Sequence, residues 1–188
     1  MKRLLILLAL IFISPAKVYA AANQDFSTLY SQTPMSTVKL MHDIDPYQDE
    51  EYHKYAWSPY PLFRTCTDLY FKDISIPAGY YLLTARNFKG VDYVLFKACG
   101  KVVYIVPVAK KTETPLDFYT HEVPRPKQTK MQKLKSRVKD AFLGSRKDSK
   151  RMPPPKSFID IADDGVYILV RYYYGNDCYW LVFKKTKY

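Results

Sequence analysis

The spacing of apolar residues changes along this chain and separates strand-like segments from helix-like ones. Short apolar runs rich in valine, isoleucine, tyrosine and phenylalanine have the composition and the length of β-strands. They cover residues 80–84, 93–96, 102–108, 166–174 and 178–183. Five of the six glycines lie at the boundaries of these runs, where they favour tight turns. The pattern predicts a mainly β, antiparallel fold.

Two stretches of this strand region, 74–97 and 159–184, resemble each other. Each has an apolar segment, a glycine, a second apolar segment, a glycine-containing turn and a closing Phe-Lys pair. The resemblance is compatible with a duplicated β-hairpin unit whose copies stack their apolar faces. We therefore expect a small antiparallel β-sandwich or partly open barrel with one or two peripheral helices. Residues 62–123 would form the first β unit and 157–188 the second.

Residues 21–61 form an N-terminal extension with weaker signals. Thr33-Pro34 predicts the start of a short helix that ends near Ile44. Its inward residues would be Met35, Val38 and Met41. The prolines of residues 57–61 predict extended chain, and residues 62–71 predict an edge strand that leads into the first β unit.

The first twenty residues have the pattern of a secretory signal peptide. Lys2 and Arg3 precede ten consecutive apolar residues, and Val18-Tyr19-Ala20 has the residue sizes of a cleavage site. Ten helical residues span about 15 Å, half of the hydrocarbon core of a bilayer, which argues against a membrane anchor. We expect export to the periplasm, the cell envelope or the extracellular space, with the mature chain beginning near Ala21.

Export also changes what the cysteines imply. Exported proteins meet an oxidising compartment in which cysteines pair. Cys66, Cys99 and Cys178 are an odd number, so we expect one disulfide and one free thiol. The sequence leaves all three pairings open.

The charge of the chain is concentrated in one segment. The full chain has a net charge of +11, which becomes +8 once the signal peptide is removed. Residues 125–156 hold twelve basic and two acidic residues, a net +10, so the rest of the mature chain carries −2. Prolines stand at both ends of this segment, at 124, 126 and 153–155. We interpret residues 124–156 as a proline-flanked basic insertion between the two β units.

Apolar residues inside the basic insertion recur at helical spacing and predict an amphipathic helix from about Gln128 to Leu143. The apolar face consists of Met131, Leu134, Val138 and Phe142. The basic residues that would contact an anionic surface are Lys127, Lys130, Lys133, Lys135, Arg137, Lys139, Arg146 and Lys147. The helix either docks its apolar face on the protein body or enters an anionic membrane surface. An anionic envelope polymer or a protein partner stays open, while export argues against nucleic acid.

Few residues combine into a constellation that could carry chemistry, and we expect no catalytic residue, no cofactor and no metal site. One acidic cluster has metal-ligand types but lacks calcium-loop spacing, because proline follows Asp45. It comprises His42, Asp43, Asp45, Asp49, Glu50, Glu51 and His53, and we interpret it as a solvated acidic loop. His121-Glu122 is the remaining acid–base pair.

Eighteen tyrosines are unusual for this length. Tyr172, Tyr173 and Tyr174 are consecutive in a predicted strand, so neighbours must lie on opposite faces and we expect at least one to be exposed. Exposed tyrosines stack on sugars or peptides, whereas buried ones cover a wide, shallow core.

These features favour an exported, non-enzymatic binding or structural module of the cell envelope that uses its basic segment on an anionic surface or partner. The alternative is a small secreted hydrolase, either a nuclease or a cysteine peptidase, that uses His121 or one of the cysteines. The alternative requires a cleft that joins a histidine to a cysteine or a carboxylate within hydrogen-bond reach.

Overall fold

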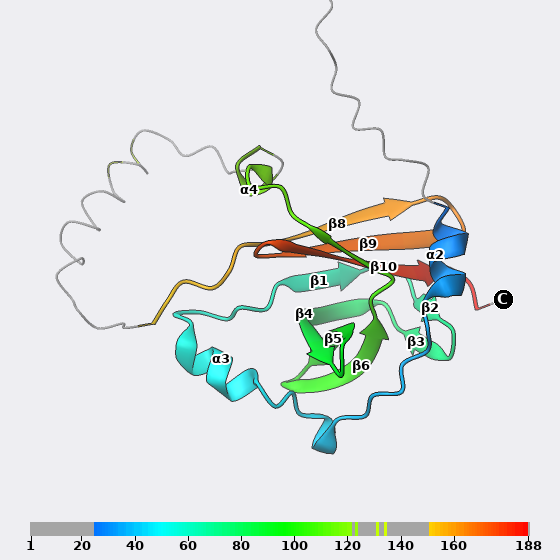
Figure 1. Ribbon diagram of the computed structural model, residues 1–188, viewed down its shortest axis with the longest axis horizontal. Coiled ribbons are helices and arrows are strands. Elements are labelled where there is room, and N and C mark those ends of the chain that lie inside the picture. The colour runs from blue at the N-terminus through cyan, green and yellow to red at the C-terminus, as the bar shows by residue number, and fades with distance from the viewer. Residues whose placement is uncertain (1–24, 122, 124–130, 132–133, 135–150, 188) are drawn as a thin grey trace, which may run out of the picture.

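The computed structural model describes residues 25–121, 123, 131, 134 and 151–187. The strands of these residues form two antiparallel sheets that pack face to face and do not close into a barrel (Figure 1). The expected mainly β, sandwich-like fold is confirmed.

The first sheet has four strands in the order β1-β4-β5-β6. They are β1 (Leu62–Thr65), β4 (Gly79–Phe88), β5 (Val91–Ala98) and β6 (Lys101–Pro107). Two-residue turns join β4 to β5 and β5 to β6, and both turn residues have positive φ in each case. Such turns match the right-handed twist of the strands. The second of these turns is Cys99-Gly100, so Cys99 takes a backbone conformation that glycine usually occupies.

The second sheet is built around the hairpin of β9 (Tyr167–Tyr174) and β10 (Asp177–Lys184). Its order is β3-β2-β10-β9-β8, and β7 pairs with the beginning of β10. The remaining strands are β2 (Leu69–Phe71), β3 (Ile74–Ile76), β7 (Lys110–Glu113) and β8 (Ser157–Asp163).

The expected single edge strand over residues 62–71 is wrong, because the chain changes sheets inside it. β1 is an edge strand of the first sheet, whereas β2 lies between β3 and β10 in the second. The hydroxyl of Thr65 donates to the carbonyl oxygen of Thr67 and turns the chain between the two strands. The Asp68 carboxylate then accepts the backbone N–H of Ala78 at 2.9 Å, which ties this crossing to the return crossing before β4.

The core lies between the inner faces of the two hairpins β4–β5 and β9–β10. Phe96 of β5 is fully buried at its centre, with ring centroids 5.9 Å from Phe63, 5.8 Å from Tyr81 and 6.2 Å from Phe183. The two stretches that resemble each other in sequence therefore supply opposing hairpins of one core. They differ in their first strands, since β8 pairs with β9 whereas β3 pairs with β2 and not with β4. A duplicated origin of the hairpins stays a prediction.

Within residues 25–121 and 151–187, three short α-helices lie at the periphery: α2 (Phe26–Gln32), α3 (Gln48–Lys54) and α4 (Phe118–His121). The predicted helix from Thr33 to Ile44 is wrong. Thr33 instead ends α2, because a residue before proline avoids helical geometry. The chain then runs extended to a 3₁₀ turn at Met41–Asp43. Met41, expected to point inward, is 80% exposed.

Removing the central ring of the core should destabilise the whole sandwich. Phe96→Ala deletes three edge-to-face ring contacts and leaves a cavity, so the free energy of unfolding should fall by about 3–5 kcal/mol. Urea denaturation followed by circular dichroism measures the loss. Tyr80→Ala is the matched control, because Tyr80 lies on the adjacent strand but is 61% exposed. An equal loss in both variants would contradict this description of the core.

Candidate functional site

A buried cluster of charges lies on the outer face of the first sheet. Side chains alternate along β4 and β5, and since Leu83 and Phe96 face the core, Arg86 and Lys97 face away from it. The segment that contains Asp45, α3 and Tyr60 covers this outer face. Asp45 and Lys97 are consequently only 1% and 2% exposed.

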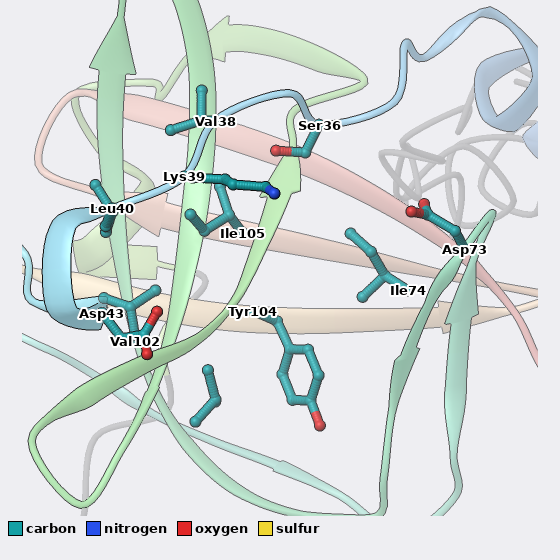
Figure 2. A pocket seen from close by; sticks show the side chains of 11 residues that line it. Ser36, Val38, Lys39, Leu40, Asp43, Asp73, Ile74, Val102, Tyr104 and Ile105 are labelled. Atoms are coloured by element: carbon teal, nitrogen blue, oxygen red, sulfur yellow. The ribbon is translucent and has the colours of Figure 1, made fainter.

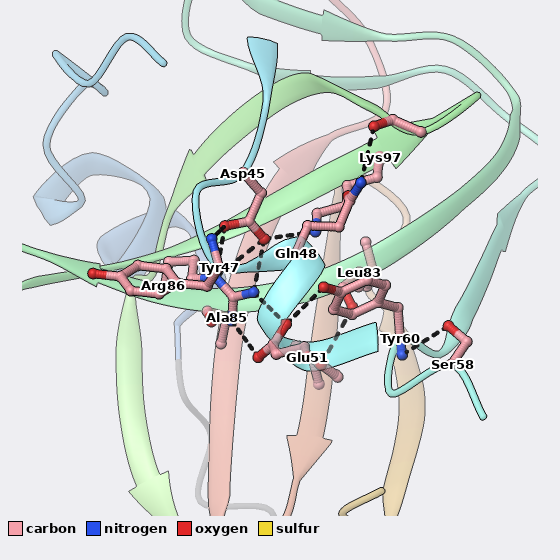
Figure 3. A network of polar contacts seen from close by, with 12 residues as sticks. Asp45, Tyr47, Gln48, Glu51, Ser58, Tyr60, Leu83, Ala85, Arg86 and Lys97 are labelled. Carbon is pink, nitrogen blue, oxygen red and sulfur yellow. Dashed lines mark hydrogen bonds and ion pairs between the residues drawn. The ribbon is translucent and has the colours of Figure 1, made fainter. Parts of the chain in front are cut away.

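The four charged side chains of this cluster satisfy one another (Figure 3). The Arg86 guanidinium donates to both Asp45 oxygens, with its Nη2 2.7 Å from Oδ2, and also to both Glu51 oxygens. The Lys97 ammonium donates to Asp45 Oδ2 at 2.6 Å. Tyr60 donates its hydroxyl to Glu51 at 2.6 Å, and its ring lies 3.9 Å from Lys97 Nζ. Two cations and two anions thus form a neutral set.

The pKa shifts in the cluster follow from burial and from these bonds. Burial alone would raise the pKa of Asp45, but hydrogen bonds from Arg86 and Lys97 outweigh it and hold that pKa below its ordinary value. Burial lowers the pKa of Lys97, and its bond to Asp45 offsets only part of this effect. Burial and the hydrogen bond to Glu51 raise the pKa of Tyr60.

The interpretation of residues 42–53 as a solvated acidic loop is wrong for Asp45 and Glu51. These two carboxylates pair with the sheet, while the other five members of the acidic cluster are exposed. No group of three or more histidine, cysteine, aspartate or glutamate side chains in the described part of the chain is placed to hold a metal ion. The ion cluster fastens the N-terminal segment to the sheet, and we assign it a structural role.

A groove of about 410 Å³ runs beside β6, the edge strand of the first sheet (Figure 2). Extended residues 36–40 form its other wall. Its lining is mixed, with Val38, Leu40 and Ile105 beside Lys39 and Asp73. Within the described residues no strand pairs with the outer edge of β6.

A second cavity, a cleft of about 500 Å³, lies on the outer face of the second sheet. Two rows of cross-strand neighbours on β8, β9, β10 and β7 run over this face. One row is Asp160, Arg171, Trp180 and Lys110, and the next is Phe158, Tyr173, Cys178 and Thr112. α4 lies over the second row, with the Phe118 ring stacked on Tyr173 at 4.1 Å between centroids. All of these residues except Lys110 line the cleft.

The tyrosine run alternates between faces as predicted. Tyr172 is fully buried in the core, and Tyr173 points to the opposite face, where it lines the cleft. The expectation that at least one of the three is exposed is wrong, since Tyr173 and Tyr174 are half-buried. Burial raises the pKa of Tyr173 to about 12, so its hydroxyl is protonated at neutral pH.

The same cleft brings together His121 and Cys178, two residues of the hydrolase alternative. Cys178 is 2% exposed, and burial raises the pKa of its thiol, so the nucleophilic thiolate is disfavoured. No hydrogen bond joins His121 to Cys178 or to a carboxylate among the described residues, and Glu122 lies outside them. His42 lies in the 3₁₀ turn and His53 in α3, and both side chains are exposed. The geometry does not assemble a nucleophile with its base.

The expected disulfide is not formed, and all three cysteines are free thiols. Cys66 follows β1 and Cys99 follows β5, and β4 lies between these strands. Two strand spacings amount to about 10 Å, more than a disulfide spans. Cys178 belongs to the other sheet and is buried.

The sequence predicts an anionic-surface set and an apolar-face set of residues in the basic insertion. The structure describes only two of these residues, both from the apolar face. Met131 and Leu134 are helical and exposed, at 68% and 59%. Val138 and Phe142 lie outside the described residues. So do Lys127, Lys130, Lys133, Lys135, Arg137, Lys139, Arg146 and Lys147.

Most residues that line the cleft were not predicted as site residues from the sequence. Asp160 and Arg171 are charged residues between apolar neighbours in their strands, a signal that each lies on an outer face of a sheet, whereas Trp180 carries no such signal. The register that sets them side by side joins strands whose pairing the sequence does not state.

Comparisons with known proteins found no relative of this chain. No protein-family description matches the chain, and no curated protein or solved structure is significantly similar to it. Within residues 25–121 and 151–187 no helix has the length and apolar character needed to cross a bilayer.

Asp45→Asn should destabilise the protein strongly. The substitution leaves Arg86 and Lys97 buried with one anion between them, so the free energy of unfolding should fall by about 3 kcal/mol. Asp73→Asn is the control, since Asp73 is exposed in the β2–β3 turn. Urea midpoints at pH 7 measure both, and an unaffected D45N protein would contradict the structural role.

The wild-type protein and the D45N variant should respond differently to acid. Because the folded-state pKa of Asp45 lies below its ordinary value of 3.8, its stabilising contribution is present above that pH. The contribution is lost as the pH falls through the lower, folded-state value. The stability difference between wild type and D45N should therefore be constant from pH 5 to 7 and shrink below about pH 3.8. A difference that grows in acid would refute the assignment.

The three thiols should differ in reactivity. Cys66 and Cys99 are exposed and should be alkylated by iodoacetamide in the native protein, whereas Cys178 is protected by burial and by its raised pKa. Intact-mass spectrometry should show two adducts in native protein and three after denaturation without reductant. Cys66→Ser and Cys99→Ser should each remove one native adduct. A single adduct after denaturation would show a disulfide and contradict the structure.

Proposed function

We propose that this protein is an exported, non-enzymatic binding module of the cell envelope whose basic insertion, residues 124–156, binds an anionic lipid surface. The observation that carries the proposal is the exposure of Met131 and Leu134 in a helical conformation. A helix docked on the body would bury this apolar face. An interfacial helix instead keeps it free to enter a lipid surface.

Charge supports the same function. The insertion carries +10 beside a mature body of −2. Each basic residue close to an anionic membrane contributes about 1 kcal/mol, and the contribution is screened by salt. Six or more lysines and arginines flanking an apolar face would give substantial affinity, and lysine stems can reach past that face to the headgroups.

The returning end of the insertion is fastened to the body, which suits a tethered surface-binding element. Met152 pairs with the chain after α3, where the Ala56 N–H donates to the Met152 carbonyl at 2.9 Å. The Lys156 carbonyl accepts the Gly175 N–H at 2.8 Å. The preceding end follows α4. A deletion of residues 125–150 leaves these anchoring contacts intact.

The remaining parts of the proposal rest on the sequence. The signal-peptide pattern of residues 1–20 supports export to the periplasm, the envelope or the extracellular space. The hydrolase alternative finds His121 and Cys178 in one cleft, but the raised pKa of the thiol opposes a cysteine nucleophile there. We therefore retain the binding module.

The mature protein should sediment with vesicles that contain phosphatidylglycerol and not with pure phosphatidylcholine vesicles. Leu134→Asp places a charge on the apolar face and should weaken binding at least about tenfold. Leu116→Asp is the matched control, because Leu116 is a 97% exposed leucine of the body. Raising NaCl from about 20 to about 500 mM should weaken wild-type binding steeply.

Two results would overturn the proposal. One is failure of the intact mature protein to bind phosphatidylglycerol vesicles at low salt. The other is unfolding of the domain by Leu134→Asp, which would show that the helix docks on the body. Circular dichroism of each variant, together with binding by the 125–150 deletion, separates these outcomes.

A further inference from the structure

The cleft on the outer face of the second sheet has a continuous aromatic wall. Phe118 of α4 stacks on Tyr173 of β9, and Phe158 of β8 lies 6.0 Å from Phe118 and 6.2 Å from Tyr173 between ring centroids. Trp180 of β10 lines the same cleft one row further along the sheet. These rings offer apolar surface at a site that the two sheets do not need for their core.

Hydrogen-bonding groups stand beside this wall. Arg171 donates from Nη2 to Asp160, while its buried Nε has no partner among the described residues. Trp180 Nε1 donates to the Thr112 hydroxyl oxygen at 3.2 Å. A buried N–H without an acceptor costs free energy, so a ligand oxygen that accepts from Arg171 Nε would be stabilised there.

The charges of the lining include both signs, with carboxylates in excess. Three carboxylates, Glu113, Asp117 and Asp160, would repel an anion. Arg171, which is paired with Asp160 and lies over the Trp180 ring, supplies the donors of the site. A neutral ligand whose groups both donate and accept satisfies carboxylates and guanidinium together. Hydroxyl groups have this property.

We propose that this cleft binds a neutral oligosaccharide. The C–H faces of the sugar rings would contact the aromatic wall, and their hydroxyls would accept from Arg171 and donate to the carboxylates. The cleft volume of about 500 Å³ lies within the range of small-ligand sites. The proposal does not depend on the basic insertion, which contributes no residue to this cleft among those described.

The two tryptophans of the chain allow a direct test. Trp57 is 62% exposed and lies outside the cleft, so Trp57→Phe leaves Trp180 as the only tryptophan in an intact mature protein. The fluorescence of this protein would be titrated with four neutral tetrasaccharides: cellotetraose, maltotetraose, mannotetraose and the tetramer of N-acetylglucosamine. A glucosamine tetramer and a galacturonate tetramer serve as cationic and anionic probes of similar size.

At least one neutral tetrasaccharide should change Trp180 fluorescence saturably, and the anionic galacturonate tetramer should bind at least about tenfold more weakly, while the cationic glucosamine tetramer should bind no more tightly. Arg171→Met should weaken the neutral ligand at least about tenfold, since hydrogen bonds to a charged group are lost. Phe118→Ala, on the half-buried α4, is the second variant and should weaken it too. Tyr80→Ala removes an exposed tyrosine elsewhere and should leave binding unchanged.

Three results would overturn the proposal: no saturable response to any neutral tetrasaccharide, tighter binding of either charged probe, or unchanged affinity in both folded cleft variants. Vesicle binding is measured separately, so failure of the saccharide proposal is distinguished from failure of the proposed lipid-surface function. The 125–150 deletion should lose vesicle binding but retain the saccharide response, because the insertion and the cleft act separately.

Discussion

The stacking of hairpin β4–β5 on hairpin β9–β10 is the constraint on which the other features depend. It fills the inner faces of both sheets with buried rings such as Phe96 and Tyr172. Because side chains alternate along a strand, Arg86, Lys97 and Arg171 are directed to the outer faces. The ion cluster and the cleft both lie on outer faces for this reason.

The charged strand residues on the two outer faces are paired to different extents. On the first sheet, Asp45 and Glu51 arrive from the N-terminal segment and neutralise Arg86 and Lys97 under a cover of chain. Such a buried set is costly to break and leaves no group free for a ligand. On the second sheet, Arg171 has one carboxylate partner, and its Nε has none within the described part of the chain, beside an open cleft. The first face is therefore covered, whereas the second has an open cleft.

Much of the fold is predictable because strand composition and turn residues are local signals. The runs that became β4, β5, β6, β9 and β10 were predicted, as was their assembly into a sandwich. The passage of residues 62–71 between sheets was not, since periodicity reports faces and not partners. Asp45 looked solvated because its partners lie 41 and 52 residues away. For the candidate site, composition pointed to the tyrosines and to the basic segment, but only the strand register unites Asp160, Arg171 and Trp180.

We propose that a self-supporting sandwich carries a basic helix that is free until it meets an anionic lipid surface. Amide hydrogen exchange by mass spectrometry, with and without bicelles containing phosphatidylglycerol, tests both halves of this claim at once. We expect new protection in residues 125–150 with anionic bicelles only, and unchanged protection in β4, β5, β9 and β10. Protection of residues 125–150 that is already strong without lipid, or that does not increase with it, would contradict the account.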